Sequence, residues 1–135
     1  MARFLVKTEP ATYSFADLRR DRRTVWDGVS NPVALKNLAT IRKGDTVIVY
    51  HTGDEKQAVG LATAASDAYP DPKLGDPRRV VVDLTPDQAL PKPVTLAQVK
   101  SDAVLKTNDL ARLPRLSVIP FSEAQYQRLL RLAGA

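Results

Sequence analysis

Residues 4–18 read FLVKTEPATYSFADL, and this stretch sets the first elements of the fold. Its apolar start predicts a short strand over residues 3–7, because such side chains suit a pleated, partly buried surface. The strand then runs into Lys7, Thr8 and Glu9, three polar side chains of different chemistry. Two explanations are open: ordinary solvation, or the rim of a pocket that holds a ligand with both donors and acceptors.

Further elements follow along the chain. Short strands are expected where runs rich in Val, Ile and other apolar residues are bounded by turn residues: 46–51, 58–65, 79–84 and 116–119. Four helices are predicted from side chains that can cap the free N–H groups of a first turn, with N-caps at Ser14, Asn31, Thr95 and Ser122. The last helix has apolar residues at helical spacing, which predicts that it packs on the sheet.

The order of these elements indicates the fold class. Strands and helices do not alternate regularly, as they would in a doubly wound parallel sheet. We therefore expect an α+β fold, a small mixed or antiparallel barrel with helices at its rim. Residues 68–79, AYPDPKLGDPRR, predict a surface loop. The chain of 135 residues fits a single domain over residues 1–135.

Composition excludes several classes of protein. The chain has no cysteine, which rules out disulfides, thiolate metal ligands and a cysteine nucleophile. Its N-terminal apolar run breaks at Lys7, too early for a signal peptide, and no run approaches the ~18 apolar residues of a membrane span. We expect a monomeric, cytoplasmic protein that meets no membrane.

The balance of charge favours a polyanionic partner. Twenty Lys and Arg against fifteen Asp and Glu give a formal charge of +5. A merely basic domain is the alternative, but the clustering of the cations favours a surface that contacts phosphates. The residues assigned to this surface are Arg19, Arg20, Arg22, Arg23, Lys36, Arg42 and Lys43.

Histidine and tryptophan each occur once. His51 has no cysteine or second histidine to help it bind an ion, so we expect no metal site. It bonds backbone at a strand end, or acts as a donor, acceptor or weak base in a cleft. Trp26 is a core residue, or it stacks a flat ring beside backbone N–H groups of the helix that follows Asn31.

The sequence lacks the usual catalytic motifs. Gly-x-Ser-x-Gly and a glycine-rich phosphate loop are both missing, which favours binding over catalysis. In the segment 111–125, ARLPRLSVIPFSEAQ, two arginines precede the predicted strand that carries Ser117. Pro114 and Pro120 restrict the backbone there, so Arg112 and Arg115 are either solvated or presented in a fixed geometry.

Several motifs together resemble the EVE domain family, which belongs to the PUA-like superfamily and is related in fold to YTH readers of methylated adenine. In chain order they are FLVKTEPATYSFADL, TVWDGVSN, KGDTVIVYH, AYPDP and RLSVIPFS, closed by an amphipathic helix. The resemblance covers nearly the whole chain. It implies a PUA-like pseudo-barrel, without a cofactor, whose pocket holds a flipped, modified base of DNA or RNA, such as methylated or hydroxymethylated cytosine.

The resemblance also implies which residues build the pocket. They are Lys7, Thr8, Glu9, Trp26, Gly28, Val29, Ser30, Asn31, His51, Arg115, Leu116 and Ser117. In this scheme Lys7 contacts a phosphate or a base carbonyl, Glu9 accepts from an exocyclic amine, and Trp26 stacks. The family usually has Arg-Asn-Tyr-Gln-Ala-Arg after Trp-Asp-Gly-Val, where this chain reads SNPVAL.

Two other functions remain open. The first is a small hydrolase, because PUA-like proteins of the ASCH type include enzymes that deacylate modified cytidines. In this alternative Thr8 is the nucleophile or holds a water molecule, and Lys7 is the base. Side chains alternate along a strand, however, which puts Lys7 and Glu9 on one side and Thr8 on the other unless the strand bends. The second is a protein-interaction module that uses the cluster Arg19 to Arg23.

Overall fold

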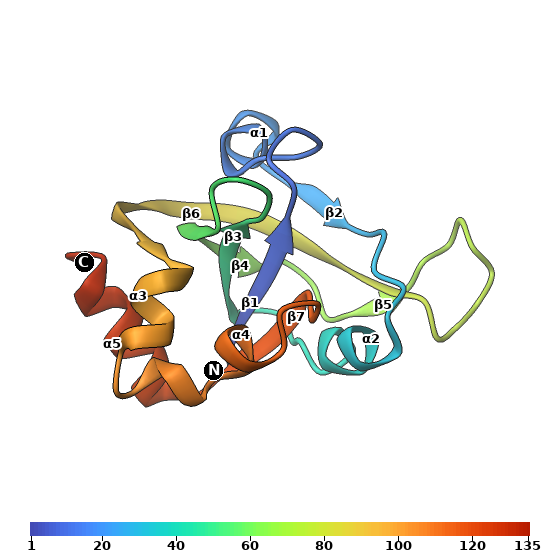
Figure 1. Ribbon diagram of the computed structural model, residues 1–135. Helices are drawn as coiled ribbons and strands as arrows, with labels where there is room; N and C mark the ends of the chain where they lie inside the picture. The colour runs from blue at the N-terminus through green and yellow to red at the C-terminus, as the bar shows by residue number, and fades with distance from the viewer.

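The computed structural model describes the whole chain, residues 1–135. Its elements, in chain order, are β1 (Arg3–Thr8), α1 (Phe15–Asp21), β2 (Thr24–Trp26), α2 (Pro32–Leu38), β3 (Thr46–His51), β4 (Gln57–Ala64), β5 (Tyr69–Pro70), β6 (Val80–Thr95), α3 (Leu96–Ser101), a 3-10 turn (Leu105–Thr107), α4 (Asp109–Arg112), β7 (Val118–Phe121) and α5 (Glu123–Leu132) (Figure 1). None of the helices has the length and apolar character needed to cross a bilayer.

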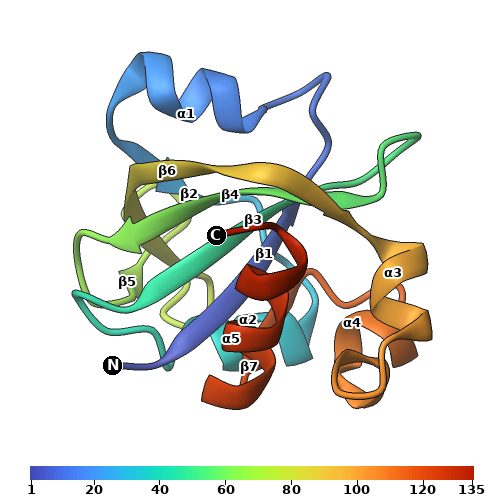
Figure 2. The same cartoon turned by 90° about the vertical axis from the view of Figure 1, so that its left-hand side faces the viewer.

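One curved sheet organises these elements. Six strands lie in the order β2-β6-β4-β3-β1-β7, and the short β5 pairs with the start of β6. All neighbours are antiparallel except β1 and β3, which run parallel. The sheet curls into a half-barrel, with α1 at one end and α3, α4 and α5 toward the other (Figure 2). The expected α+β barrel with helices at its rim is confirmed.

The capping residues predicted from the sequence begin their helices. Ser14, Thr95 and Ser122 each form a complete capping box at the start of α1, α3 and α5. Asn31 caps α2 by accepting from two backbone N–H groups. The structure adds β2, β5, α4 and the 3-10 turn, which the sequence patterns did not predict, because each is too short to show a period.

The strand β6 is much longer than expected. We predicted a strand over residues 79–84, but pairing continues to Thr95 through three prolines. Pro91 and Pro93 lie in an irregular stretch between the pairs Gly60–Ala89 and Ala58–Val94, where no ladder hydrogen bond is required. Proline cannot donate to a ladder and is therefore tolerated at such bulges. This bulged strand contacts α1 and leads into α3.

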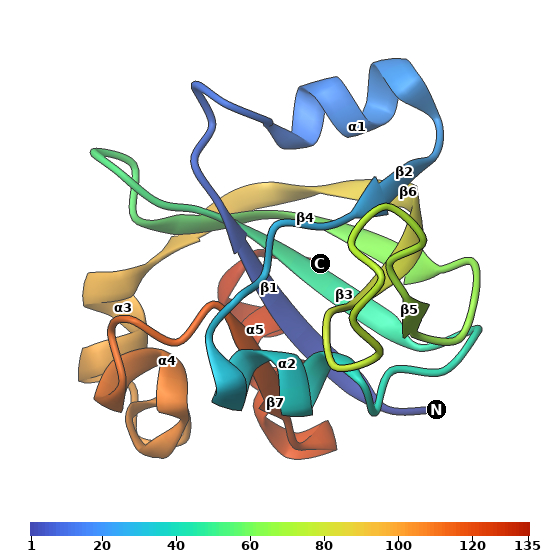
Figure 3. The same cartoon turned by 90° about the vertical axis from the view of Figure 1, so that its right-hand side faces the viewer.

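The core lies between the sheet and its helices. All six residues of β3 are buried, because β3 lies between β1 and β4 and is covered on both faces. The helix α1 is anchored by Phe15 and Leu18, both buried, and α2 by Ala34, Leu35 and Leu38. Figure 3 shows α1 beyond the end of β1, and α2 lower down, beside β7.

A buried carboxylate holds the segment between α3 and β7. The side chain of Asp102 is 6% exposed and accepts hydrogen bonds from Arg128 Nε at 2.8 Å and from the N–H groups of Val104 and Leu105 at 3.0 Å each. Hydrogen bonding to Arg128, helped by the two backbone groups, lowers the pKa of Asp102 against the opposing effect of burial. Asp102 therefore favours its charged form in the folded protein.

We expect Asp102→Asn to lower the free energy of unfolding at pH 7 by about 1–2 kcal/mol, because a charge-assisted bond is lost while Arg128, a third exposed, stays hydrated. A carboxylate whose pKa is lower in the folded protein than in the unfolded chain stabilises the folded state at pH values above its unfolded pKa. This stabilisation is lost as the pH falls through the pKa of the folded state. The deficit should therefore shrink below about pH 4. Urea unfolding at pH 7 and 3 measures it, with the exposed Asp87→Asn as control; an equal deficit at both pH values contradicts the assignment.

Candidate functional site

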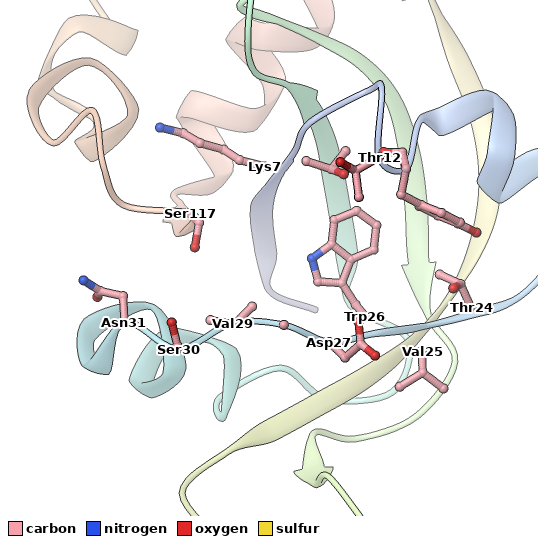
Figure 4. Close-up of a pocket in the computed structure, with 13 residues that line it drawn as sticks. Lys7, Thr12, Thr24, Val25, Trp26, Asp27, Val29, Ser30, Asn31 and Ser117 are labelled. Atoms are coloured by element: carbon pink, nitrogen blue, oxygen red, sulfur yellow. The ribbon is translucent and has the colours of Figure 1, made fainter. Parts of the chain in front are cut away.

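A cavity of about 560 Å³ opens where β1 leaves the sheet, between the loop before α1, the strand β2 and the segment that enters α2 (Figure 4). This volume is typical of sites for small ligands, about 300–1,000 Å³. The residues that line it are Lys7, Thr8, Thr12, Tyr13, Thr24, Val25, Trp26, Asp27, Gly28, Val29, Ser30, Asn31 and Ser117. The structure therefore brings together eight of the twelve pocket residues implied by the resemblance.

The end of β1 explains why two consecutive residues share this cavity. The strand stops at Thr8, and the chain turns so that the N–H groups of Thr12 and Tyr13 both donate to the carbonyl of Glu9 at 2.9 Å. Thr8 Oγ1 donates to the carbonyl of Tyr13 at 2.6 Å and so ties the turn to the strand. Lys7 and Thr8 both line the cavity although they are consecutive on β1, and the prediction allowed this if the strand bends; the chain turns directly after Thr8.

Glu9 itself lies outside the cavity. It is exposed; its Oε1 accepts from the N–H of Ala11 at 3.3 Å, and its Oε2 accepts from Thr52 Oγ1 at 3.4 Å. The carboxylate also lies so close to Gly53 that an added Cβ there would be 2.7 Å from Oε2. Glu9 thus joins the loop after β1 to the loop after β3, and the contact with an exocyclic amine is not supported by its position.

His51 is also outside the cavity lining. It is buried, its Nε2 accepts from the N–H of Phe15 at 3.0 Å, and its Nδ1 lies 2.9 Å from Glu55 Oε1. Because Nε2 is an acceptor, the ring proton sits on Nδ1 and is donated to Glu55. This hydrogen bond lowers the pKa of Glu55. Of the two alternatives for His51, the structure supports the bond to backbone, which fixes the start of α1.

Trp26 belongs to both the core and the cavity wall. It is 8% exposed, it is part of the main apolar cluster, and it pairs with Val82 across β2 and β6. The ring of Tyr13 meets it edge-on, with centroids 6.3 Å apart and planes at 80°. The indole nitrogen points into the cavity and makes no hydrogen bond to the protein (Figure 4). Trp26 thus offers a ligand both an aromatic surface and a free donor.

Lys7 lies at the mouth of the cavity. Its Nζ donates to the carbonyl of Pro114 at 2.9 Å and lies 5.7 Å from the centre of the Tyr50 ring. The side chain extends away from the indole, toward the segment before β7 (Figure 4). Burial lowers the pKa of Lys7 from its ordinary value. Only one of its three donors is used, so Lys7 can still bind an anion or a carbonyl.

Another wall comes from the turn before α2, while Ser117, just before β7, lies beside Lys7 and accepts from its backbone N–H at 3.0 Å. Gly28 has φ +79°, a conformation that favours glycine, and the chain then passes Ser30 and Asn31. Asn31 Oδ1 already accepts from the N–H groups of Val33 and Ala34 at 2.9 and 3.1 Å. These two N–H groups are therefore occupied by the cap and are not available to a ligand. The amide nitrogen of Asn31 makes no hydrogen bond and is a donor at the cavity rim.

The other predicted residues are spread over the surface. Arg115 and Leu116 line a neighbouring groove rather than this cavity. Arg20 pairs with Asp17 and Asp21, and Arg23 pairs with Asp83. The five remaining cations of the predicted phosphate surface are exposed and have no carboxylate partner: Arg19, Arg22, Lys36, Arg42 and Lys43. No group of three His, Asp or Glu side chains is placed to hold a metal ion.

Five lining residues were missed from the sequence: Thr12, Tyr13, Thr24, Val25 and Asp27. Tyr13 carried a signal, because it lies within the Lys-Thr-Glu-Pro-x-x-Tyr-Ser motif. The others lie on the turn after β1, on β2 or, in the case of Asp27, directly after β2, whose three residues pair only with β6. Their position could not be read from local pattern.

Comparisons with known proteins agree with this geometry. The EVE domain profile matches residues 2–132. An NMR structure of a Rhodopseudomonas palustris protein is 34% identical, with a TM-score of 0.94, and the match covers 99% of this chain and 94% of that one. Human THYN1 protein, solved in complex with DNA containing 5-methylcytosine, is 25% identical with a TM-score of 0.91, over 100% and 99% of the two chains.

A more distant likeness extends to RNA readers. The YTH domain of the MRB1 protein of Zygosaccharomyces rouxii, solved in complex with N6-methyladenosine RNA, has a TM-score of 0.58 over 98% of this chain and 86% of that one. At 14% identity this likeness concerns the fold alone. A comparison with curated protein sequences gave no match.

Proposed function

Because the chain belongs to the EVE domain family, we propose that it is a nucleic-acid reader whose cavity holds one flipped, modified base, with 5-methylcytosine in DNA as the best-supported ligand. The observation that carries the proposal is the free indole N–H of Trp26, which points into a cavity large enough for a base. The THYN1 relative supports DNA and this base, because it covers the whole chain and was solved with them.

The cavity offers groups that suit a cytosine ring. Donors come from the indole N–H of Trp26, the amide of Asn31 and the ammonium of Lys7, and cytosine presents a carbonyl oxygen and a ring nitrogen as acceptors. The hydroxyl of Ser117 also lines the cavity, near Lys7, and can accept a hydrogen bond from the exocyclic amine of cytosine. Extruding a base costs a few kcal/mol, and stacking of ~1–3 kcal/mol with these bonds offsets it.

Selectivity for the methyl group should be modest. One buried methyl contributes about 0.8 kcal/mol, which corresponds to roughly fourfold in affinity. At low salt we expect an oligonucleotide with one 5-methylcytosine to bind about fourfold more tightly than the same oligonucleotide with cytosine. Binding should also change the fluorescence of Trp26, the only tryptophan. A titration of DNA and RNA oligonucleotides, modified and plain, measures both. If none of them binds or changes the fluorescence, the proposal is wrong.

The hydrolase alternative finds less support in the geometry. Thr8 Oγ1 donates to the Tyr13 carbonyl and Lys7 Nζ to the Pro114 carbonyl, so neither activates the other. Glu9 lies outside the cavity lining. Turnover of an acylated cytidine that is lost in Thr8→Ala would nevertheless make the enzyme the better assignment.

A further inference from the structure

Two more cavities adjoin the central one and share residues with it. The first, of about 480 Å³, lies between α2 and residues 76–80, and we name it the basic groove. The second, of about 360 Å³, lies between the start of α2 and residues 113–116, and we name it the apolar groove. Ser30 lines both the central cavity and the basic groove, and Asn31 lines both the central cavity and the apolar groove. The central cavity therefore adjoins a groove at Ser30 and another at Asn31.

The basic groove presents two cations that no carboxylate neutralises. Its only acidic residue, Asp76, is engaged by Arg78 at two distances of 3.2 Å, which leaves Lys36 and Arg79 unpaired. Arg79 Nε donates to the carbonyl of Val29 at 3.2 Å, so its guanidinium is tethered to the wall of the central cavity. Its remaining N–H groups are free, in a geometry that suits a phosphate.

The apolar groove has the opposite character. Val33 is 54% exposed and Leu113 is 46% exposed, and both line the groove. Few large apolar side chains in this protein are so exposed, and Val25, on the central cavity, is another of them. Exposed apolar side chains that line a common groove mark a surface that is covered by a partner. The free cation Arg115 lies at its edge.

We propose that the three cavities form one track for a DNA strand. The modified base lies in the central cavity, a phosphate on one side of it contacts Lys36 and Arg79, and the neighbouring base on the other side packs against Val33 and Leu113. This inference rests on the proposed function and adds the path of the strand to it. An acidic peptide could satisfy the basic groove, but only a nucleic-acid strand regularly supplies phosphates and flat base faces in alternation, next to a base in the central cavity.

Two variants with matched controls test the track. Lys36→Gln removes a proposed phosphate contact of the basic groove. Its control is Lys100→Gln, which removes an exposed cation on α3. The double variant Val33→Ser, Leu113→Ser removes two apolar side chains of the apolar groove. Its control is Val104→Ser, which removes a similarly exposed apolar side chain outside the groove. Fluorescence anisotropy gives Kd for single-stranded DNA, and for the matching RNA, with one 5-methylcytosine or cytosine and zero, one or two nucleotides added on either side.

We expect Lys36→Gln to raise Kd roughly tenfold at 50 mM salt and to lower the salt slope by about 0.7, equally for methylated and plain strands. The double serine variant should raise Kd roughly fivefold for strands that carry an added nucleotide on the side of the base that lies in the apolar groove. For strands without that nucleotide its Kd should equal that of the wild type. Both controls should bind as the wild type does.

The outcomes separate the track from the reader function. If methylated strands still bind more tightly while neither variant changes Kd at any length, the track is overturned and the base cavity stands. If no strand binds, both proposals fail. If the variants weaken binding of RNA strands but not of DNA, the assignment of the track to DNA is overturned.

Discussion

Replacing Trp26 with alanine is expected to remove measurable binding of the modified base and to lower the free energy of unfolding by about 3–5 kcal/mol. The indole is 8% exposed and packs in the main apolar cluster, so its loss leaves a cavity in the core. Stacking on an aromatic ring supplies about 1–3 kcal/mol per base, and the indole N–H is lost with the ring. Titration of methylated DNA and urea unfolding measure the two effects.

Because the alanine variant is destabilised, Trp26→Phe separates binding from folding. Phenylalanine keeps an aromatic ring against Tyr13 but removes the N–H that points into the cavity. We expect this variant to fold with a loss below about 1.5 kcal/mol and to bind the methylated strand roughly tenfold more weakly, the effect of one unmade hydrogen bond. Unchanged affinity in Trp26→Phe would show that the indole N–H does not contact the base.

Adding a single methyl group at Gly60 should be nearly as damaging. Gly60 lies on β4, buried under the ring of Phe15, and a Cβ there would lie about 2.5 Å from the Cε1 and Cε2 atoms of that ring. Neighbouring strands hold β4 on both sides, so the backbone cannot retreat. We expect Gly60→Ala to lower the free energy of unfolding by about 3 kcal/mol, measured by urea denaturation.

A double-mutant cycle identifies the cause of this loss. Phe15→Leu alone should cost about 1 kcal/mol, because a smaller side chain leaves part of the site unfilled. In the double variant the new methyl group occupies that space, so the combined loss should be smaller than the sum by at least about 1 kcal/mol. Additive losses would place the clash elsewhere.

Phe15 also supports the part of the chain that forms the cavity wall. Phe15 donates its N–H to His51 and begins α1, and the turn that carries Thr12 and Tyr13 directly precedes it. Displacing the ring should therefore disturb the aromatic wall of the cavity before the rest of the sheet. A loss of base binding in Gly60→Ala that exceeds its loss of folded protein would show this coupling.

Local pattern was sufficient for the elements whose signals lie within a few residues. Ser14, Asn31, Thr95 and Ser122 each begin a helix as predicted, because a capping side chain bonds a backbone group only two or three residues away. The apolar runs of β1, β3 and β4 were found for the same reason. The motifs around Lys7 and Trp26 likewise indicated a family whose profile matches the chain.

Other features depended on contacts between distant residues. The extension of β6 to Thr95 contradicts the local effect of its prolines, and only its bulged pairing with β4 permits it. Glu9 and His51 have the polar chemistry expected of pocket residues, yet one binds Thr52 across a loop and the other binds Phe15. Their partners lie 36 or more residues away, beyond the reach of any local pattern.

The sequence by itself thus determined the capped helices, the central strands and the family, since these depend on neighbours along the chain. Only the tertiary structure decided which polar residues face the cavity, and that Ser30 and Asn31 join it to a groove on either side. The physical reason is that a side chain's direction at the end of a strand is set by the turn that follows and by the elements packed against it. Residues of β2, of the segment that enters α2 and of the segment before β7 line the cavity together with the end of β1 only because the sheet is curled.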